Sequence, residues 1–181
     1  MSSFRFSKSV LIILLLAVAV AAPALAEPAL DIRPGECPNF IDRGLSGYVP
    51  MVLVSDFGFP ISRLDIMAGS LRLHRADGVG GSDTPLIFRR GHRFLDLSSQ
   101  ALEGICPTME LDGIPDLLLR FGQRRIVQKL QLGAVPLNES IEICLSGLTR
   151  DGAPFTACDD AIISDFRIFA DEPDDNVGIL K

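Results

Sequence analysis

Short runs of alternating apolar and polar residues recur along this chain. Residues 70–75 and 140–143 alternate, whereas 48–54 and 117–121 are more continuously apolar, as in strands covered on both faces. Pro, Gly and Asp residues separate these runs and are typical of turns. The pattern predicts an all-β fold, an antiparallel β-sandwich of the immunoglobulin-like kind.

Helical signals are few in this sequence. Ser62 with Asp65 has the spacing of a cap for one short turn. Residues 124–130 place Ile126, Val127 and Leu130 at helical spacing. We therefore expect one or two short helical turns beside the strands.

The N-terminus has the pattern of a secretory signal peptide. Arg5 and Lys8 precede an unbroken apolar run over residues 10–22, and the small-residue site 24–26 follows directly before Glu27. A membrane anchor is the alternative interpretation, but a span needs about 20 apolar residues and this run is shorter. We expect cleavage after Ala26 and no membrane span in the mature chain.

Three segments follow from this pattern. Residues 1–26 are the expected signal peptide, residues 27–169 the β-sandwich domain, and residues 170–181 an acidic C-terminal tail. The tail is interpreted as solvated, because nothing in it fixes the geometry of a cation site. The expected location is periplasmic or secreted, and the oligomeric state stays open.

The charge balance argues against a nucleic-acid partner. The chain has 17 basic and 23 acidic residues, a net charge of −6. Without Arg5 and Lys8 of the leader, 15 basic residues remain and the net charge is −8. Binding to phosphate backbones demands a basic face, which an acidic chain of this kind does not favour.

The four cysteines all follow the leader, and an even number in an oxidising compartment indicates two disulfides. They are Cys37, Cys106, Cys144 and Cys158, and four cysteines allow three pairings. No Cys-x-x-Cys motif occurs, and with only His74 and His92 available a zinc site is not expected.

Residues 143–158 predict a hairpin in register. The loop 150–152 fits a three-residue turn with Gly152 in the left-handed position. This register places Cys144 opposite Cys158 at a non-hydrogen-bonded site, where strands approach most closely, and on the other face from Leu145 and Phe155. A Cys144–Cys158 bridge would then leave Cys37 and Cys106 for the second pair.

Three stretches of the sequence form a set: Leu-Asp-Ile-Arg-Pro-Gly-Glu-Cys-Pro-Asn over residues 30–39, Asp-Gly-Ile-Pro-Asp-Leu-Leu-Leu-Arg-Phe over 112–121, and Cys-Leu-Ser-Gly-Leu-Thr-Arg-Asp-Gly-Ala-Pro-Phe over 144–155. Together they resemble a β-rich module that is common in exported bacterial proteins. The resemblance covers about residues 30–163. It implies a secreted module without an established catalytic role, often an accessory part of larger extracellular proteins.

The segment around Asp112 invites a calcium interpretation. Alternating acids with a glycine place oxygens around a hard cation, and here Glu110, Asp112 and Asp116 occupy such positions. The first acid and the closing glutamate of a calcium loop are replaced by Thr108 and Leu119. The alternative is a turn before a strand, in which Asp112 and Asp116 accept local backbone hydrogen bonds. No other cofactor is expected.

An arginine cluster at residues 89–93 is a candidate anion site. Arg89, Arg90 and Arg93 could bind phosphate, sulfate or carboxylate groups through their guanidinium forks. The alternative is a solvated face, because alternation along a strand would divide the cluster between two faces and pair it with acids such as Asp83 and Asp96.

Catalytic motifs are missing from the sequence. It contains no Gly-x-Ser-x-Gly elbow, no His-Glu-x-x-His helix and no phosphate-cradling glycine loop. His74 lies in an alternating run and is expected to point outward. The sequence therefore predicts a non-catalytic binding or structural module, and the resemblance described above implies an extracellular glycan or protein as its ligand. A calcium-dependent adhesion module or a small secreted hydrolase are the alternatives.

Overall fold

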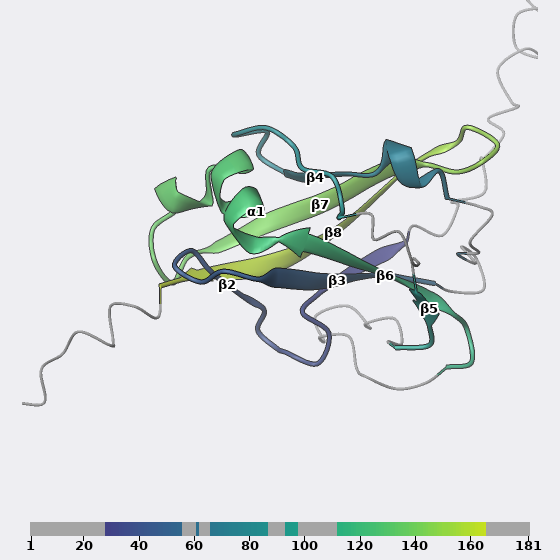
Figure 1. The fold of residues 1–181 in the computed structure, drawn as a ribbon, viewed down its shortest axis with the longest axis horizontal. Helices are drawn as coiled ribbons and strands as arrows, with labels where there is room; N and C mark the ends of the chain where they lie inside the picture. Colours follow the sequence, from purple (N-terminus) through teal and green to yellow (C-terminus); the bar gives the residue numbers. More distant parts are fainter. Residues whose placement is uncertain (1–27, 56–60, 62–65, 87–92, 98–111, 166–181) are drawn as a thin grey trace, which may run out of the picture.

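The short alternating runs form strands of two packed four-stranded sheets (Figure 1). A computed structural model describes residues 28–55, 61, 66–86, 93–97 and 112–165. The strands are β1 (Ala29–Ile32), β2 (Phe40–Asp42), β3 (Tyr48–Val54), β4 (Arg72–Arg75), β5 (Arg93–Leu95), β6 (Asp116–Gly122), β7 (Ser140–Leu148) and β8 (Pro154–Ser164). The helices are η2 (Ala68–Ser70), α1 (Gln123–Lys129) and η3 (Leu132–Ala134).

Along its length, the chain passes from one sheet to the other several times. One sheet has the order β1-β3-β6-β5 and the other β2-β8-β7-β4. The predicted run 48–54 becomes β3 with the expected bounds, and the runs 117–121 and 140–143 become parts of β6 and β7. The run 70–75 becomes β4 only from Arg72 onward, because Ser70 ends η2. The prediction of an all-β fold with two sheets is confirmed.

One strand pair departs from the expected antiparallel arrangement. β2 runs parallel to β8, with Phe40 opposite Ile162 and Asp42 opposite Ser164. The chain leaves β1 in one sheet, enters β2 in the other, and returns to the first sheet for β3. A strand reached by such a crossing takes its direction from the route of the chain, whereas a tight hairpin can only join antiparallel strands.

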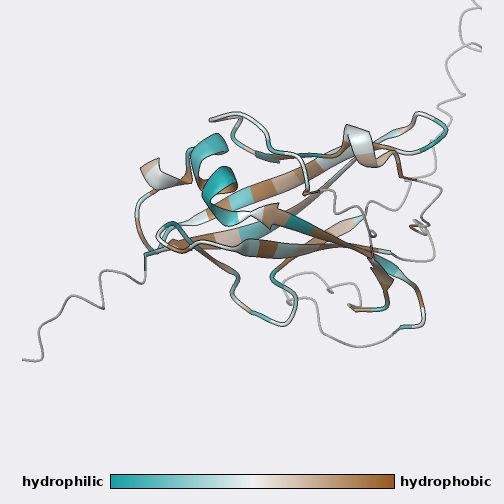
Figure 2. Cartoon of the chain, in the orientation of Figure 1, coloured by the Kyte–Doolittle hydropathy of each residue, from teal (hydrophilic) through white to brown (hydrophobic). Residues whose placement is uncertain are grey.

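The core consists mainly of apolar side chains from the facing sides of both sheets, with further ones from the helices. Leu30, Met51, Leu119, Leu145 and Ile163 are all buried in it. Figure 2 shows brown and paler residues alternating along β7, in keeping with a strand that has one core face and one outer face.

The prediction that 117–121 is covered on both faces is only partly right. Leu117, Leu119 and Phe121 are buried, but Leu118 is half-buried and Arg120 is exposed. In β3, likewise, Tyr48 at the first position is exposed. The outer faces of both strands are therefore covered over only part of their length.

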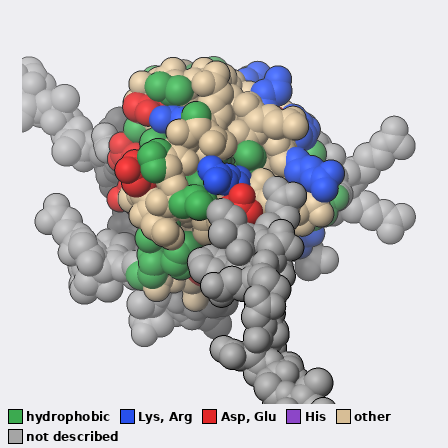
Figure 3. All heavy atoms as spheres, turned by 90° about the vertical axis from the view of Figure 1, so that its left-hand side faces the viewer, with side chains coloured by type: hydrophobic (Ala, Val, Ile, Leu, Met, Phe, Trp, Pro, Cys, Tyr) green, Lys and Arg blue, Asp and Glu red, His purple; other side chains and the backbone are tan. Residues whose placement is uncertain are grey.

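Helix α1 confirms the predicted helical turn at residues 124–130, and it begins at Gln123. Ile126 and Leu130 are fully buried, and Val127 packs against the core at half-burial. The helix lies at one end of the sandwich, which Figure 3 faces, and Lys and Arg side chains gather on part of that end. The other predicted turn, at Ser62 and Asp65, lies outside the described residues.

Arg75 breaks the alternation of β4. The pattern puts Leu73 and Arg75 on the core face, and Arg75 is indeed 8% exposed. Its guanidinium pairs with the Asp77 carboxylate and donates from Nη1 to the Leu130 carbonyl, 3.4 Å away. An arginine is accommodated here because a helix C-terminus offers carbonyl groups without intrahelical partners.

Candidate functional site

The β7–β8 hairpin has the predicted register and the predicted disulfide. Cys144 lies opposite Cys158 and is bonded to it, with their Cα atoms 4.0 Å apart. The turn closes through Thr149 and Ala153, and Gly152 has φ +87°. Cys37 is also disulfide-bonded. The expected partner Cys106 lies outside the described residues.

The disulfide lies at the centre of a polar outer surface on the β2-β8-β7-β4 sheet, which we call the polar face. Cross-strand register places its side chains in rows over β4, β7 and β8. Its members are Arg72, His74, Glu142, Cys144, Ser146, Thr156, Cys158 and Asp160. Most are exposed or half-exposed, whereas Cys144 is only 3% exposed.

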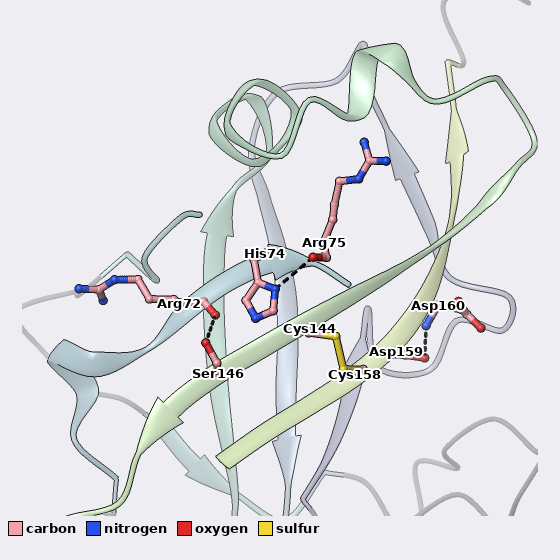
Figure 4. The surroundings of a disulfide bond; sticks show 8 residues. All are labelled: Arg72, His74, Arg75, Cys144, Ser146, Cys158, Asp159 and Asp160. Atoms are coloured by element: carbon pink, nitrogen blue, oxygen red, sulfur yellow. Dashed lines mark hydrogen bonds between the residues drawn. A yellow bond between two sulfur atoms is a disulfide. The ribbon is translucent and has the colours of Figure 1, made fainter. Parts of the chain in front are cut away.

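Arg72 and His74 both use neighbouring backbone carbonyls to hold their positions. Arg72 Nη1 donates to the carbonyls of Gly69 and Leu71, at 2.9 and 2.7 Å. The Nδ1 atom of His74 lies 3.1 Å from its neighbour's carbonyl oxygen, that of Arg75. Figure 4 shows the imidazole beside Cys144. His74 is half-exposed and points outward, as predicted.

The other end of the polar face carries two acids directly opposite one another. Glu142 pairs with Asp160 in the register, and both side chains are exposed. The pair is two residues from the disulfide along each strand, so it has the same close cross-strand geometry. Like charges at such positions repel each other, which favours a ligand that donates hydrogen bonds or positive charge there.

Asp159 points to the opposite side of β8 and connects the two sheets. Its Oδ2 accepts hydrogen bonds from the Ile32 backbone N–H in β1 and from Asn39 Nδ2, both at 2.8 Å. Oδ1 accepts from the Asp160 N–H at 2.8 Å. Sequence reasoning missed this residue, although an acid at a core-facing position of β8, between Ala157 and Ala161, was visible in the alternation.

The environment of Asp159 favours its protonated form. Burial raises the pKa of this carboxyl above its ordinary value, and the negative charge of Asp160 acts in the same direction. The hydrogen bonds from Ile32, Asp160 and Asn39 lower the pKa and offset part of this effect. Asp159 therefore connects the sheets through hydrogen bonds, although burial and the neighbouring charge of Asp160 disfavour its ionised form.

The described part of the calcium candidate is occupied by backbone contacts. Asp116 is fully buried, and its carboxylate accepts the N–H groups of Ser55 and Leu97, both at 2.9 Å. Asp112 is exposed and accepts the Ile114 N–H at 2.8 Å. Glu110 lies outside the described residues. The contacts of Asp112 are those of the turn interpretation, whereas Asp116 accepts from residues that follow β3 and β5.

A neighbouring acid also accepts hydrogen bonds from the backbone of this turn. Asp96 accepts the N–H groups of Asp112 and Gly113, at 3.2 and 2.9 Å. Across the residues that the structure describes, no three His, Cys, Asp or Glu side chains are grouped so that they could hold a metal ion. The calcium site stays a prediction of the sequence.

The predicted arginine cluster lies mostly beyond the described ranges. Arg89 and Arg90 fall outside them, and Arg93 opens β5 opposite Leu118. The structure instead reveals a second basic group, on β6 and α1, which we call the cationic end: Arg120, Arg124, Arg125 and Lys129. Its sequence signal is the absence of any acid between Asp116 and Glu139, a stretch with four basic residues.

Comparisons of the chain with models of protein families, with curated proteins and with solved structures found no match. Among the described residues, no helix has the length and apolar character needed to cross a membrane.

Proposed function

We propose that the chain is an exported, non-catalytic binding or structural module, and that its polar face recognises a glycan or a surface protein. The leader pattern supports export, and the oxidised Cys144–Cys158 pair is consistent with an oxidising compartment. The immunoglobulin-like character of the sandwich belongs to the same proposal, since it rests on strand pattern and on two packed sheets.

One observation carries the proposal: three neighbouring strands present polar side chains in register around a covalent bridge. The bridge joins β7 to β8 directly, and β4 pairs with β7 over Arg72 to Arg75. A surface held in this way loses little conformational freedom when a ligand binds, which favours affinity.

The side chains on the polar face suit a polyhydroxylated ligand. Arg72 and Thr156 lie in one row, separated by Ser146, and the acids Glu142 and Asp160 lie in another. Sugar hydroxyl groups both donate and accept hydrogen bonds, so acids can accept from them while arginine and hydroxyl side chains donate. We therefore favour a glycan over a protein as the first ligand to test.

The surroundings of His74 support a binding role over catalysis. His74 is the only histidine in the part of the chain that the structure describes. Its cross-strand neighbour is Cys144, whose sulfur is bonded to Cys158 and cannot act as a thiolate nucleophile.

The test is a glycan array with the processed protein, followed by binding measurements on any glycan it retains. We expect the double variant Glu142→Gln/Asp160→Asn and the single variant Arg72→Gln each to weaken binding about tenfold, the loss of one or two charge-assisted hydrogen bonds. Glu139→Gln and Arg150→Gln are the matched controls, because both residues are exposed and lie outside the polar face.

Retention of glycan binding in the polar-face variants would place the ligand elsewhere and contradict the proposal. So would equal losses in the control variants. If no glycan binds, the same variants are tested against surface proteins captured by crosslinking, and insensitivity to the polar-face substitutions there contradicts the proposal as a whole.

A further inference from the structure

The cationic end stands out against the charge of the rest of the molecule. Four basic residues and no acid lie between Asp116 and Glu139, whereas the chain beyond the leader has a net charge of −8. At physiological ionic strength charges are screened beyond about 8 Å, so a surface ligand senses mainly the local cluster. The cationic end can therefore attract anions although the whole chain is acidic.

Packing of α1 determines which of its side chains face outward. Gln123 is buried at the start of the helix, where its backbone N–H donates to the Gly47 carbonyl at 3.0 Å and its Nε2 to the Asp42 carbonyl at 2.5 Å. Ile126 and Leu130 enter the core. Arg124, Arg125 and Lys129 are left exposed on the outer side of the helix.

The far end of α1 is equally well anchored. The Gly81 N–H donates to the Lys129 carbonyl at 2.7 Å. Gly80 approaches so closely that a Cβ there would lie 2.9 Å from the Lys129 carbonyl oxygen. The orientation of the basic side chains is thus determined by contacts at both ends of the helix.

Within the described residues, some cations of this end are paired with acids and others are not. Arg125 pairs with the buried Asp83, with Nη2 and Oδ1 2.5 Å apart, and nearby Arg43 pairs with Asp165 at 3.0 Å. Neither Arg124 nor Lys129 is in an ion pair with any residue of the described ranges. Two exposed charges are therefore available on one short helix.

Large apolar side chains are exposed near the start of α1. Tyr48 is 53% exposed and lies opposite Gly122, the residue directly before α1. Leu45 is 44% exposed and lies in the loop whose Gly47 carbonyl accepts the Gln123 N–H. Figure 3 shows hydrophobic side chains and Lys or Arg side chains intermixed on this end of the molecule.

We infer that the cationic end docks on a membrane surface that contains anionic phospholipids. Lys and Arg side chains bind the phosphate layer, and a tyrosine with an adjacent leucine suits the boundary between headgroups and acyl chains. Basic residues alone would suit any polyanion. The exposed Tyr48 and Leu45 favour the lipid surface, because a soluble polyanion offers them no apolar environment.

The test measures cosedimentation of the protein, expressed as the full chain and purified after export, with vesicles. One set contains phosphatidylcholine only, and the other about 30% phosphatidylglycerol. We expect binding to the anionic vesicles only, and loss of binding at about 0.5 M salt, where screening is strong.

Separate variants test the basic and the apolar side chains of the cationic end. Arg124→Gln/Lys129→Gln should lower the partition coefficient about 30-fold, since each basic residue near the membrane contributes about fivefold. Tyr48→Ser should lower it roughly fivefold through lost apolar burial. Arg150→Gln is the matched control, an exposed arginine in the hairpin turn at the opposite end, and should bind as the unchanged protein does.

Three results overturn the inference: no binding to anionic vesicles, equal binding to both vesicle sets, or unchanged binding by the double variant. A parallel arm uses inorganic polyphosphate, a soluble polyanion that is not a glycan. Binding to polyphosphate without binding to anionic vesicles identifies a polyanion site instead and likewise contradicts the inference. Because the polar face is not involved, none of these results bears on the glycan proposal.

Discussion

The β7–β8 hairpin and the β1–β2 segment are adjacent in the sandwich but are held by different kinds of contact. The hairpin pairs residues close in sequence, from Leu148 with Pro154 to Ser140 with Ile162, and a disulfide joins its strands. The β1–β2 segment contacts β8 through residues more than a hundred positions away, including the hydrogen bonds of Asp159. Local pairing can be derived from sequence, whereas the distant contacts depend on the assembled fold.

The largest expected effect comes from removing the hairpin disulfide. Cys144→Ala/Cys158→Ala should lower the free energy of unfolding by about 3 kcal/mol, the chain-entropy value for a loop of about 15 residues. Urea denaturation measures it. We expect the amide-exchange pattern of β7 and β8 to be retained, because the turn and the alternation specify the register without the bridge. A changed register would show that the bridge, and not the local pattern, specifies the pairing.

The second effect tests the contact between the sheets. Asp159→Ala leaves the Ile32 N–H without its acceptor and removes one acceptor of Asn39, so we expect a loss of about 2 kcal/mol in urea denaturation. The control is Asp160→Ala, at the exposed neighbouring position, which should change stability by less than about 0.5 kcal/mol. Equal effects of the two substitutions would disprove the structural role of Asp159.

A third prediction concerns close packing within the hairpin itself. A Cβ added at Gly147 would lie 2.8 Å from Phe155 Cζ and 2.9 Å from Leu71 Cδ2. Gly147→Ala should therefore cost about 1–2 kcal/mol through overpacking of the core. Gly133→Ala serves as the control, because no heavy atom lies within 4 Å of its added Cβ. A neutral Gly147→Ala would mean that Phe155 repacks without cost.

The smallest expected effect is on how the free energy of unfolding depends on pH. One acid from each region, Asp159 and Asp151, should contribute with opposite sign. The raised pKa of Asp159 means that its contribution to stability falls as the pH rises from about 3.8 through the folded-state value. The pKa of Asp151 in the hairpin turn is lowered, chiefly by the Thr149 hydroxyl, so its contribution is lost as the pH falls below 3.8.

Urea denaturation between about pH 2.5 and 6 of Asp159→Asn and Asp151→Asn, each compared with the unchanged protein, measures the two contributions. Slopes of opposite sign are expected. Slopes of the same sign would contradict the assignment of the two environments.

The candidate sites show the same contrast between local patterns and contacts of distant residues. The outward position of His74 and the central bridge of the polar face follow from alternation and from counting back from Gly152. The role of Asp116 does not, because its carboxylate accepts N–H groups from Ser55 and Leu97. The residues around Asp116 in the sequence do not indicate which distant backbone groups will donate hydrogen bonds to it.

The strand-rich fold, the hairpin register with its disulfide, and the helical turn at 124–130 could all be predicted from short-range patterns in the sequence; the structure has this helix at 123–129. Each depends on the period of the side chains and on turn residues, which act over a few positions. Three other features depend on the assembled fold: the parallel pairing of β2 with β8, the burial of Arg75 under a helix terminus, and the position of the Asp159 carboxylate between the sheets. These depend on where distant segments meet, and a buried polar group is stable only where those segments supply its hydrogen-bond partners.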